Sequence, residues 1–387
     1  MTRPSRRKRT LAIVSSSRAD LAHLVHPLRA LAGSEVVEPV VLATGAMLQG
    51  TFGRPVELLA REPVRVVPVG CDLEIERGVD AARAIGRATI GFADVLDSMD
   101  PDLLMVVADR FEMLAPASAA LAMKIPVVHV EGGERSEGAI DDAVRNALTK
   151  MSHLHLVTTE AARRRVMAMG EEAWRVHRVG AGSLDHFRVG PIPDRSELEA
   201  GLGHGLGDRL VLAAVHPVTL ARDPVQDAHA LLDALERRAR PGEVVVFAFP
   251  NADEGSRRVR EAVRSFVEAR EGAALHTNLE ARAWIGLLHQ ASVVVGNSSS
   301  ILMETPSVPV PAVCVGTRQA GRERAANVLD ADAEPGAILA ALEEAETLSM
   351  EGVTNPYGDG NASARIRRVL EEAPDRERLL SKTTTLS

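Results

Sequence analysis

The sequence predicts an α/β protein built from two Rossmann-like, doubly wound domains that face one another across a cleft. The chain has 387 residues, which is about twice the length of a typical domain. Short runs rich in valine and isoleucine alternate with longer amphipathic stretches, and this alternation is typical of parallel βαβ units. The alternation occurs twice, and a proline- and glycine-rich segment at 186–208 separates the two series.

Each series supplies its own set of strands and helices. In the first series we expect strands within 11–17, 36–44, 64–70, 103–109, 125–130 and 154–159, with helices such as 79–99 and 111–124 between them. In the second series we expect strands within 210–215, 243–249, 291–297 and 310–315, separated by helices at 227–240, 255–270 and 281–290.

The domain boundary is expected inside the proline- and glycine-rich segment. We place the first domain at residues 1–187 and the second at 188–387. The final helix, 361–373, is expected to cross back to the first domain, and the tail 379–387 is expected to fray.

Composition excludes several classes of partner. A formal net charge of −8 and an aromatic content of 3% argue against a nucleic acid partner, because phosphates would be repelled and bases would find few stacking platforms. No run approaches the ~20 apolar residues of a membrane span, so no membrane partner is expected. Cys71 and Cys314 each lie in an apolar run, as expected for buried thiols in a reducing compartment. We therefore expect a soluble, cytoplasmic protein.

Two motifs suggest a cofactor or a metal but lack the residues that would complete them. Gly180 and Gly182 begin a dinucleotide fingerprint, yet Asp185 occupies the third glycine position and a linker follows instead of a long helix. His153 and His155 stand two residues apart without an HExxH or a paired CxxC motif. The sequence therefore predicts no bound NAD, no other cofactor and no metal.

Polar residues follow the predicted core strands directly. Asp109, Glu131, His216 and Asn251 each end or follow a strand, and the stretch 296–300, GNSSS, does the same. Ligands of doubly wound sheets bind beyond the carboxyl ends of the strands, so these residues are site candidates. The run 129–146 also carries five carboxylates spaced by glycines, for which a solvated loop is the simpler alternative.

The GNSSS stretch is suited to an anion. Its glycine and three hydroxyl residues stand between a buried strand and a helix, where backbone N–H groups and the helix dipole favour a diphosphate. Glu304 lies about one helical turn further on, where a carboxylate can accept from ribose hydroxyls. Arg318 follows the next strand and offers a fork of donors to phosphate. A serine helix cap without a ligand is the alternative.

Taken together, these stretches closely resemble the hydrolysing UDP-N-acetylglucosamine 2-epimerases, the enzymes that open sialic acid synthesis. The similar segments span nearly the whole chain in order: SSRAD (16–20), ADRFEMLA (108–115), HVEGGERSEGAIDDAVRNALTKMSHLH (129–155), VGAGSLD (179–185), HPVT (216–219), FPNADEGS (249–256), GNSSS (296–300), GTRQAGRERAANVLD (316–330) and NPYGDGNASARI (355–366).

This resemblance implies a fold, a reaction and a set of site residues. The fold would be the two-domain arrangement of the GT-B glycosyltransferases, and the products would be UDP and N-acetylmannosamine, formed without a cofactor. A homodimer or homotetramer is implied as well. Catalytic roles would fall to Asp109, Glu131, Asp141 and His216. UDP would be bound, mainly by the second domain, through Arg18, Asn251, Asp253, Ser298, Ser299, Glu304 and Arg318.

Clustered carboxylates suit that reaction for a chemical reason. The C2 hydrogen of the sugar becomes acidic as the C1–O bond to UDP breaks, so a carboxylate is a sufficient base. A second acid-base group must then help water add to the resulting glycal and protonate C2 on the opposite face. Crowded carboxylates keep acid and base forms available together.

Four positions depart from the family pattern. Met47 and Asn146 stand where histidines are usual, and Ala108 and Ile301 stand where glycines are usual. Losing two imidazoles from a sugar-facing region predicts altered proton transfer or a different amino sugar. A diverged family member acting on another nucleotide sugar, a GT-B glycosyltransferase and a non-catalytic nucleotide-sugar binder remain alternatives.

Overall fold

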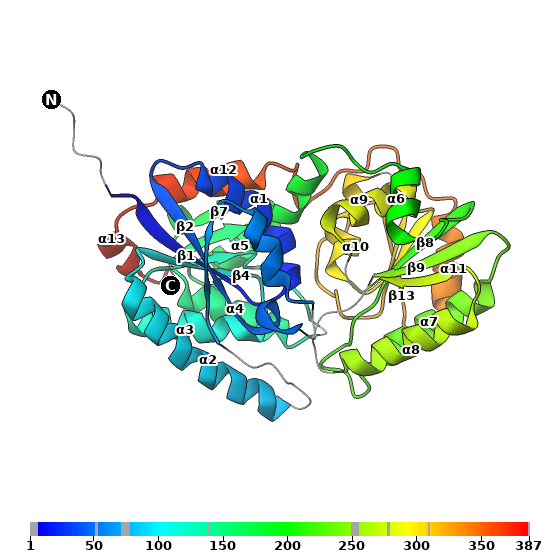
Figure 1. Cartoon of the computed structure of the whole chain (residues 1–387), viewed down its shortest axis with the longest axis horizontal. Coiled ribbons are helices and arrows are strands. Elements are labelled where there is room, and N and C mark those ends of the chain that lie inside the picture. Colours follow the sequence, from blue (N-terminus) through cyan, green and yellow to red (C-terminus); the bar gives the residue numbers. More distant parts are fainter. Residues whose placement is uncertain are drawn as a thin grey trace. The chain divides into compact units, whose positions relative to one another are not determined.

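The computed structural model describes residues 7–50, 53–70, 78–137, 139–248, 255–276, 279–308 and 310–385. The chain divides into two compact units, whose elements are labelled in Figure 1. The first unit comprises Met1–Glu134, Asp141–Asp185 and Gly360–Ser387, and the second comprises Arg135–Ile140 and His186–Asp359.

The first unit is built on a parallel sheet of seven strands in the order β3-β2-β1-β4-β5-β6-β7. Strand order reverses between β1 and β4, which is the switch point at which ligands bind in such sheets. The strands are β1 (Arg9–Ser15), β2 (Val37–Ala43), β3 (Arg65–Pro68), β4 (Leu103–Val107), β5 (Val127–Val130), β6 (Leu154–Val157) and β7 (Val176–Arg178).

Helices cover both faces of this sheet because its central strands are apolar on both sides. Leu11 and Ile13 of β1 belong to the core under α1 (Arg18–Ala32) and α12 (Ala362–Glu372). Ala12 and Val14 belong to the opposite core, under α2 (Gly78–Met99) and α3 (Leu114–Ala122). Helices α4 (Asp141–Met151) and α5 (Glu160–Ala168) complete the layers, which Figure 1 shows above and below the sheet.

The second unit repeats this plan with six parallel strands in the order β10-β9-β8-β11-β12-β13. Its switch point lies between β8 and β11. The strands are β8 (Arg209–Ala214), β9 (Glu243–Ala248), β10 (Ala273–His276), β11 (Val293–Gly296), β12 (Ala312–Val315) and β13 (Val328–Ala331). The helices are α6 (Arg195–Leu202), α7 (Gln226–Arg238), α8 (Ser256–Ala269), α9 (Ala281–Gln290), α10 (Ser299–Met303) and α11 (Pro335–Ala345).

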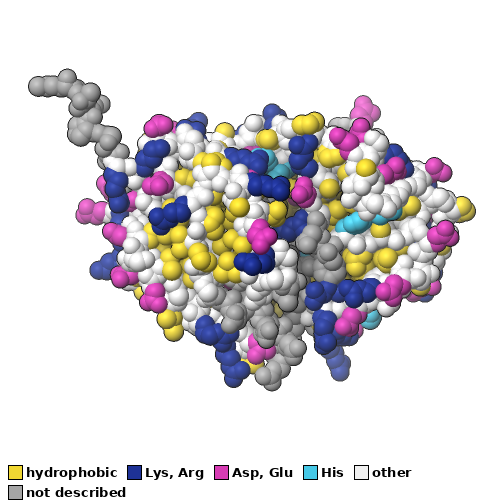
Figure 2. Space-filling view, viewed as in Figure 1, with side chains coloured by type: hydrophobic (Ala, Val, Ile, Leu, Met, Phe, Trp, Pro, Cys, Tyr) yellow, Lys and Arg dark blue, Asp and Glu magenta, His cyan; other side chains and the backbone are white. Residues whose placement is uncertain are grey.

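Short 3₁₀ turns link several of these elements. They are η1 (Gly45–Leu48), η3 (Pro55–Arg61), η4 (Phe111–Met113), η5 (Ala173–Arg175), η6 (Gly182–Phe187) and η7 (Thr305–Ser307). The two parallel sheets with helices on both faces confirm the predicted α/β, doubly wound fold class. No helix in the described part of the chain is long and apolar enough to cross a membrane. Figure 2 shows basic and acidic side chains interspersed over the visible face.

The C-terminal segment is anchored to the first unit. The side chain of Asp185 accepts hydrogen bonds from the N–H groups of Ala362 and Ser363 and so caps α12. At the other end of α12, the Arg9 guanidinium donates to four carbonyls, including those of Leu370 and Ala373. The helix α13 (Arg376–Leu380) follows.

The expectation that the tail frays is wrong for its described part. The buried Arg175 donates to the carbonyls of Leu379 and Ser381, and Leu379 itself is fully buried. Lys382 donates to the carbonyls of Lys150 and Ser152. Hydrogen bonds from two long basic side chains therefore hold a segment whose polar composition predicted disorder.

Buried ionisable groups give the first unit a built-in sensitivity to acid. Burial raises the pKa of Glu171, but hydrogen bonds from His155, Lys150 and Lys382 outweigh burial and lower that pKa to about 2. Burial lowers the pKa of His129 to about 4, although its 2.8 Å hydrogen bond to the Ala108 carbonyl opposes that shift. The native fold therefore holds Glu171 as a carboxylate and His129 as a neutral imidazole. Both groups bind a proton more readily in the unfolded chain.

We predict that the fold loses stability as pH falls below neutrality. The His129 contribution is complete above pH 6.5 and is lost as pH falls toward 4, because the unfolded imidazole binds the proton first. Its full size is roughly 3 kcal/mol. Urea unfolding between pH 7 and pH 5 should show a shallower pH dependence in His129→Gln, while the exposed control His229→Gln should keep the wild-type slope. Equal slopes in all three proteins would contradict the prediction.

Candidate active site

Two neighbouring strands of the first unit end in residues with left-handed backbone conformations. Ala108, directly after β4, has φ +57°, and Glu131, directly after β5, has φ +63°. Non-glycine residues rarely adopt this conformation, and such strain is found where the surrounding structure imposes it, often at functional sites. The Ala108 N–H donates to the Val130 carbonyl and the Glu131 N–H donates to the Leu156 carbonyl, which fixes both turns.

Asp109, the first predicted catalytic residue, forms an ion pair with Arg145 of α4. The Arg145 side chain is only 1% exposed, whereas that of Asp109 is 18% exposed. Arg145 also donates to the Glu134 carbonyl at 3.0 Å and lies 3.6 Å from the Asp142 carboxylate. A buried guanidinium beside Asp109 favours its ionised form.

Glu131, the second predicted catalytic residue, is buried and paired with a histidine. Its Oε1 lies 2.8 Å from Nδ1 of His23 on α1. His23 was not predicted from the sequence, because it lies within an amphipathic helix that follows a serine-rich strand end. The signal in the sequence is its position: it is the first polar residue after Asp20, three residues further along α1 and so on the same side of the helix.

The carboxylates of the run 129–146 do not act as one cluster. Glu134 is buried and accepts a hydrogen bond from the Thr158 hydroxyl. Glu137 belongs to the second unit, where it pairs with Arg135 at 3.1 Å. Asp141, the third predicted catalytic acid, is the first residue of α4, where the helix dipole favours negative charge.

The structure shows the surroundings of Met47 and Asn146, the two residues that replace the usual family histidines. The Met47 side chain is fully buried in the core under α1, so the expectation that this position faces a sugar is wrong. A thioether fills this apolar space, which a histidine could enter only as a desolvated imidazole. Asn146 lies on α4 and donates to the Asp142 carboxylate at 3.2 Å.

The serines before Arg18 serve the local turn. Asp20 accepts hydrogen bonds from the backbone N–H and hydroxyl groups of both Ser16 and Ser17, at distances from 2.6 to 3.2 Å. This arrangement closes the β1–α1 turn and caps the helix. Arg18, predicted to contact UDP, is the first residue of α1.

In the second unit, Asn297 organises the switch point between β8 and β11. Its side chain accepts from the His216 N–H at 2.7 Å and donates to the His216 carbonyl at 2.9 Å. It also donates to Asp227 at 3.0 Å. Gly296 precedes it with φ +140°, and a Cβ there would lie 2.0 Å from the Ala214 carbonyl oxygen, so only glycine permits this approach.

The hydroxyl loop follows Asn297 directly. Ser298 stands at the N-cap position of the short helix α10 without a capping hydrogen bond from its side chain, and Ser299 is the first residue of the helix. The Ser300 hydroxyl donates to the Ser298 hydroxyl at 2.9 Å. Glu304 ends α10, and its Oε2 accepts from the indole N–H of Trp284 at 2.6 Å. The structure thus brings the predicted residues Ser298, Ser299 and Glu304 together on one short element.

Arg318 lies beside this loop and is held by its backbone. One guanidinium nitrogen donates to the Asn297 carbonyl at 3.2 Å, and Gln319 donates to the same oxygen at 3.0 Å. The buried Nε of Arg318 has no hydrogen-bond acceptor in the described part of the chain. Burial raises the pKa of the nearby Asp227 carboxyl, although Asn297 and Arg318 oppose that shift. Asn251 and Asp253, also predicted to contact UDP, lie outside the described residues.

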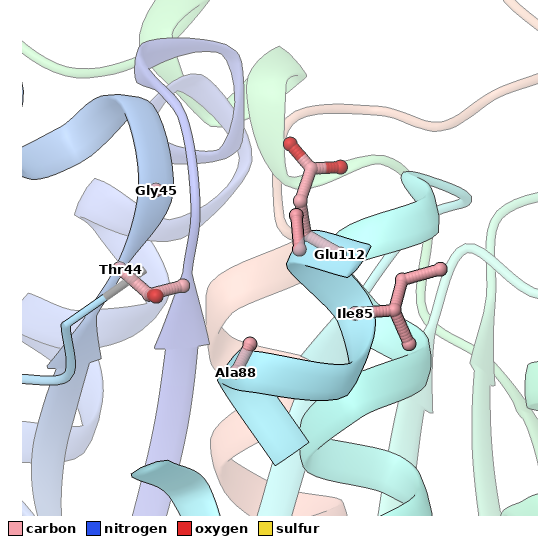
Figure 3. A pocket seen from close by; sticks show the side chains of 6 residues that line it. Thr44, Gly45, Ile85, Ala88 and Glu112 are labelled. Carbon is pink, nitrogen blue, oxygen red and sulfur yellow. The ribbon is translucent and has the colours of Figure 1, made fainter. Parts of the chain in front are cut away.

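A small hollow lies beside the ends of β1 and β2 in the first unit (Figure 3). Its lining comprises Thr44, Gly45, Ala84, Ile85, Ala88 and Glu112. Burial raises the pKa of Glu112, although Arg110 opposes that shift with a hydrogen bond. None of the predicted catalytic residues is in this lining. Within the described ranges, no group of three or more histidine, cysteine or acidic side chains is placed to hold a metal ion.

Comparison with known proteins decides the family. The family model described as UDP-N-acetylglucosamine 2-epimerase matches residues 29–371. The chain belongs to the UDP-N-acetylglucosamine 2-epimerase family. The resemblance to this family that the sequence motifs indicate is thereby confirmed, and the match covers most of the chain.

Individual relatives within this epimerase family are hydrolysing enzymes. The UDP-N,N'-diacetylbacillosamine 2-epimerase (hydrolyzing) of Legionella pneumophila is 33% identical over 97% of this chain and 98% of its own length. The GDP/UDP-N,N'-diacetylbacillosamine 2-epimerase (hydrolyzing) of Campylobacter jejuni is 31% identical over 84% of this chain and 85% of its own length. The prediction that the chain is an enzyme of the hydrolysing 2-epimerase class is confirmed.

A solved structure agrees on the fold. The UDP-GlcNAc 2-epimerase of Methanocaldococcus jannaschii, in complex with UDP-GlcNAc and UDP, matches with a TM-score of 0.74 at 17% identity. The match covers 93% of this chain and 99% of the other. The two-domain, GT-B-like fold of the epimerase is therefore confirmed.

The strained Ala108 of this epimerase gives a stability prediction. A left-handed alanine costs about 1–2 kcal/mol, while a glycine adds about 0.4–1 kcal/mol of unfolded-state entropy. Ala108→Gly, which restores the usual family residue, should therefore raise the free energy of unfolding by up to about 1 kcal/mol. Ala82→Gly, at an exposed site in the right-handed helix α2, should lower it by a similar amount. Destabilisation by both changes in denaturant titrations would contradict the prediction.

Proposed function

We propose that this epimerase acts on a UDP-linked 2-acetamido sugar and releases UDP and the free 2-epimer through a glycal. UDP-N-acetylglucosamine and UDP-N,N'-diacetylbacillosamine are the two substrates to compare first. The observation that carries the proposal is the placement of Asp109 and Glu131 at adjacent strand ends of the first unit, each with a side chain that controls its charge.

The first unit would supply the acid-base groups. Glu131 takes the C2 proton while the C1–O bond to UDP breaks and the C1–C2 double bond forms. Asp109, beside the buried Arg145, remains ionised and stabilises positive charge that develops at C1. Asp141 serves as the second acid-base group, which protonates C2 on the opposite face while water adds to C1.

The second unit would hold UDP. Ser298 and Ser299 offer hydroxyls and backbone N–H groups to the diphosphate. Arg318, whose Nε has no acceptor among the residues that the structure describes, supplies a positive donor. Glu304 accepts from the ribose hydroxyls, and His216 lies at the switch point beside Asn297. Arg18, Asn251 and Asp253 complete the proposed set of UDP-binding residues.

A glycosyltransferase would use the same nucleotide-binding residues but has no need for the paired acids. A non-catalytic binder would have no use for them either. Two cysteines, Cys71 and Cys314, each in an apolar run, support a location in the reducing cytoplasm. The family resemblance supports a homodimer or homotetramer. Both statements remain predictions.

We predict turnover that labels the sugar at C2. In deuterated water, UDP-N-acetylglucosamine or UDP-N,N'-diacetylbacillosamine should give UDP and a free 2-epimer carrying one deuterium at C2, observed by NMR. UDP-glucose, which lacks the acetamido group, serves as the control substrate. Asp109→Asn should lower kcat by about 10²–10⁴ while UDP binding persists. If the C2 hydrogen is retained and turnover requires an acceptor, the protein is a glycosyltransferase. If none of these nucleotide sugars is turned over, the protein only binds them.

We also predict that Arg318 carries UDP affinity. A charge-assisted hydrogen bond contributes about 1.5–3 kcal/mol, so Arg318→Met should weaken UDP binding by roughly 10- to 150-fold in isothermal titration. Arg237→Met, which removes an exposed arginine of α7 paired with Asp233, is the matched control and should bind UDP as the wild type does. If both variants bind UDP with equal affinity, Arg318 does not contribute to UDP binding.

A further inference from the structure

His23 has a geometry that the proposed residue roles leave unexplained. Its Nδ1 lies 2.8 Å from Oε1 of Glu131, and the two side chains are 20% and 6% exposed. Nδ1 and Oε1 do not meet the geometry of a hydrogen bond with one another, so the contact is an ion pair when the imidazole is protonated. Two unprotonated acceptors would repel at this distance, which favours the protonated imidazole beside the carboxylate.

The backbone around this pair holds both partners in place. Asp20 locks the turn that starts α1, one helical turn before His23. Glu131 is held in its left-handed conformation by the hydrogen bond from its N–H to the Leu156 carbonyl. At the backbone of α1, a Cβ at Gly182 would lie 2.2 Å from the His23 carbonyl oxygen. Glycine is therefore needed there for η6 to pack against the helix.

This packing gives the VGAGSLD motif (179–185) a structural role. Gly182 lets η6 approach the backbone of α1 at His23, and Asp185 caps α12 three residues later. The motif therefore fixes the position of α1, and with it the position of the His23 imidazole against Glu131.

We propose that His23 is a positioning residue whose imidazolium pairs with Glu131 and keeps Glu131 ionised for the removal of the C2 proton. This inference rests on the proposed function. Before the step, His23 is protonated and Glu131 is not. During the step, Glu131 gains the C2 proton, the C1–C2 double bond forms, and the electron pair of the C1–O bond leaves with UDP. The pair then carries one more proton and one more unit of positive charge than before.

Other ionisable groups lie on the same element as His23 or on other elements of the first unit. They are Arg18, Asp20 and His26 of α1, Asp109 after β4, His129 of β5, His155 of β6, Asp185 of η6 and Arg365 of α12. Burial lowers the pKa of the three histidines in this set, which favours their neutral form. A substitution at His23 leaves these groups in place. Comparing wild type with a His23 variant therefore isolates the contribution of the imidazole.

The test measures UDP release as a function of pH. In His23→Gln the amide can still donate a hydrogen bond but cannot carry a proton charge. We expect the acid limb of kcat/KM to move up by about one pH unit, because Glu131 loses a partner that stabilises its charge. We expect kcat to fall by roughly 10- to 100-fold, the C2-deuterium isotope effect to rise, and KM to change by less than about threefold.

Two further variants separate electrostatics from structure. His23→Lys supplies a positive charge that does not titrate near neutrality, so its acid limb should lie within about half a pH unit of the wild type. His26→Gln changes the other histidine of the same helix, one turn further along, and should leave the profile unmoved. A wild-type acid limb and isotope effect in His23→Gln, or an equal shift in His26→Gln, would overturn the inference.

A measurement on the folded protein without substrate covers the case in which His23→Gln does not fold. In ¹⁵N-histidine NMR spectra, Glu131→Gln should lower the titration midpoint of His23 by about one pH unit, because the imidazolium loses its carboxylate. An unchanged midpoint would overturn the inference. No turnover by the wild type on any UDP-amino sugar would overturn the proposed function and this inference together, whereas turnover with an unmoved His23→Gln profile would overturn this inference alone.

Discussion

The first unit depends on one electrostatic constraint: a carboxylate taken out of water needs a donor brought to it by a neighbouring element. Removing an ionised carboxylate from water costs several kcal/mol unless it is paired or hydrogen-bonded. Each buried acidic side chain in the described part of this unit meets that condition. The pairs are Asp20 with Ser16 and Ser17, Glu112 with Arg110, Glu131 with His23, Glu134 with Thr158, Glu171 with Lys150 and Lys382, and Asp185 with the start of α12.

The partner chosen for each acid separates structural from chemical roles. Asp185 accepts from backbone N–H groups, and Glu171 accepts from two lysines as well as from His155, which suits anchors of the C-terminal segment. Glu131 stands at a strand end beside the imidazole of His23, a side-chain type whose unperturbed pKa lies nearest neutrality. Its position at the strand end, and not the identity of the partner alone, therefore marks Glu131 as the acid suited to proton transfer.

How far the sequence predicts this structure depends on the range of each interaction. Apolar runs identified the central strands and the repeated βαβ rhythm, because burial on both faces leaves a strong local signal. The strands β7, β10 and β13 were not predicted, since they have only three or four residues and lie at the edges of their sheets. The anchored tail was missed because Arg175 and Lys382 hold it from positions that no local pattern connects.

The same limit applies to the site. Strand-end position was enough to identify Asp109, Glu131 and the GNSSS loop as candidates, since parallel strands bring their carboxyl ends to one edge. It could not identify their partners. Arg145 is 36 residues from Asp109, and His23 is more than 100 residues from Glu131, so only the fold joins them. Asn297 was inside a recognised motif, yet its role as the link between His216 and Asp227 follows only from its side-chain geometry.

The two positions at which the family histidines are replaced, Met47 and Asn146, have different structural surroundings. Met47 fills the core under α1, so this change alters packing and carries little information about the sugar. Asn146 lies on α4 one turn after Asp142 and on the same helix as Arg145, the partner of Asp109. An amide there donates one hydrogen bond without titrating, whereas a histidine would add a second proton-carrying group beside the acids. With His23 beside Glu131, the first unit retains an imidazole next to a candidate catalytic acid despite the loss at 146. The changes at 47 and 146 therefore do not by themselves require a different sugar.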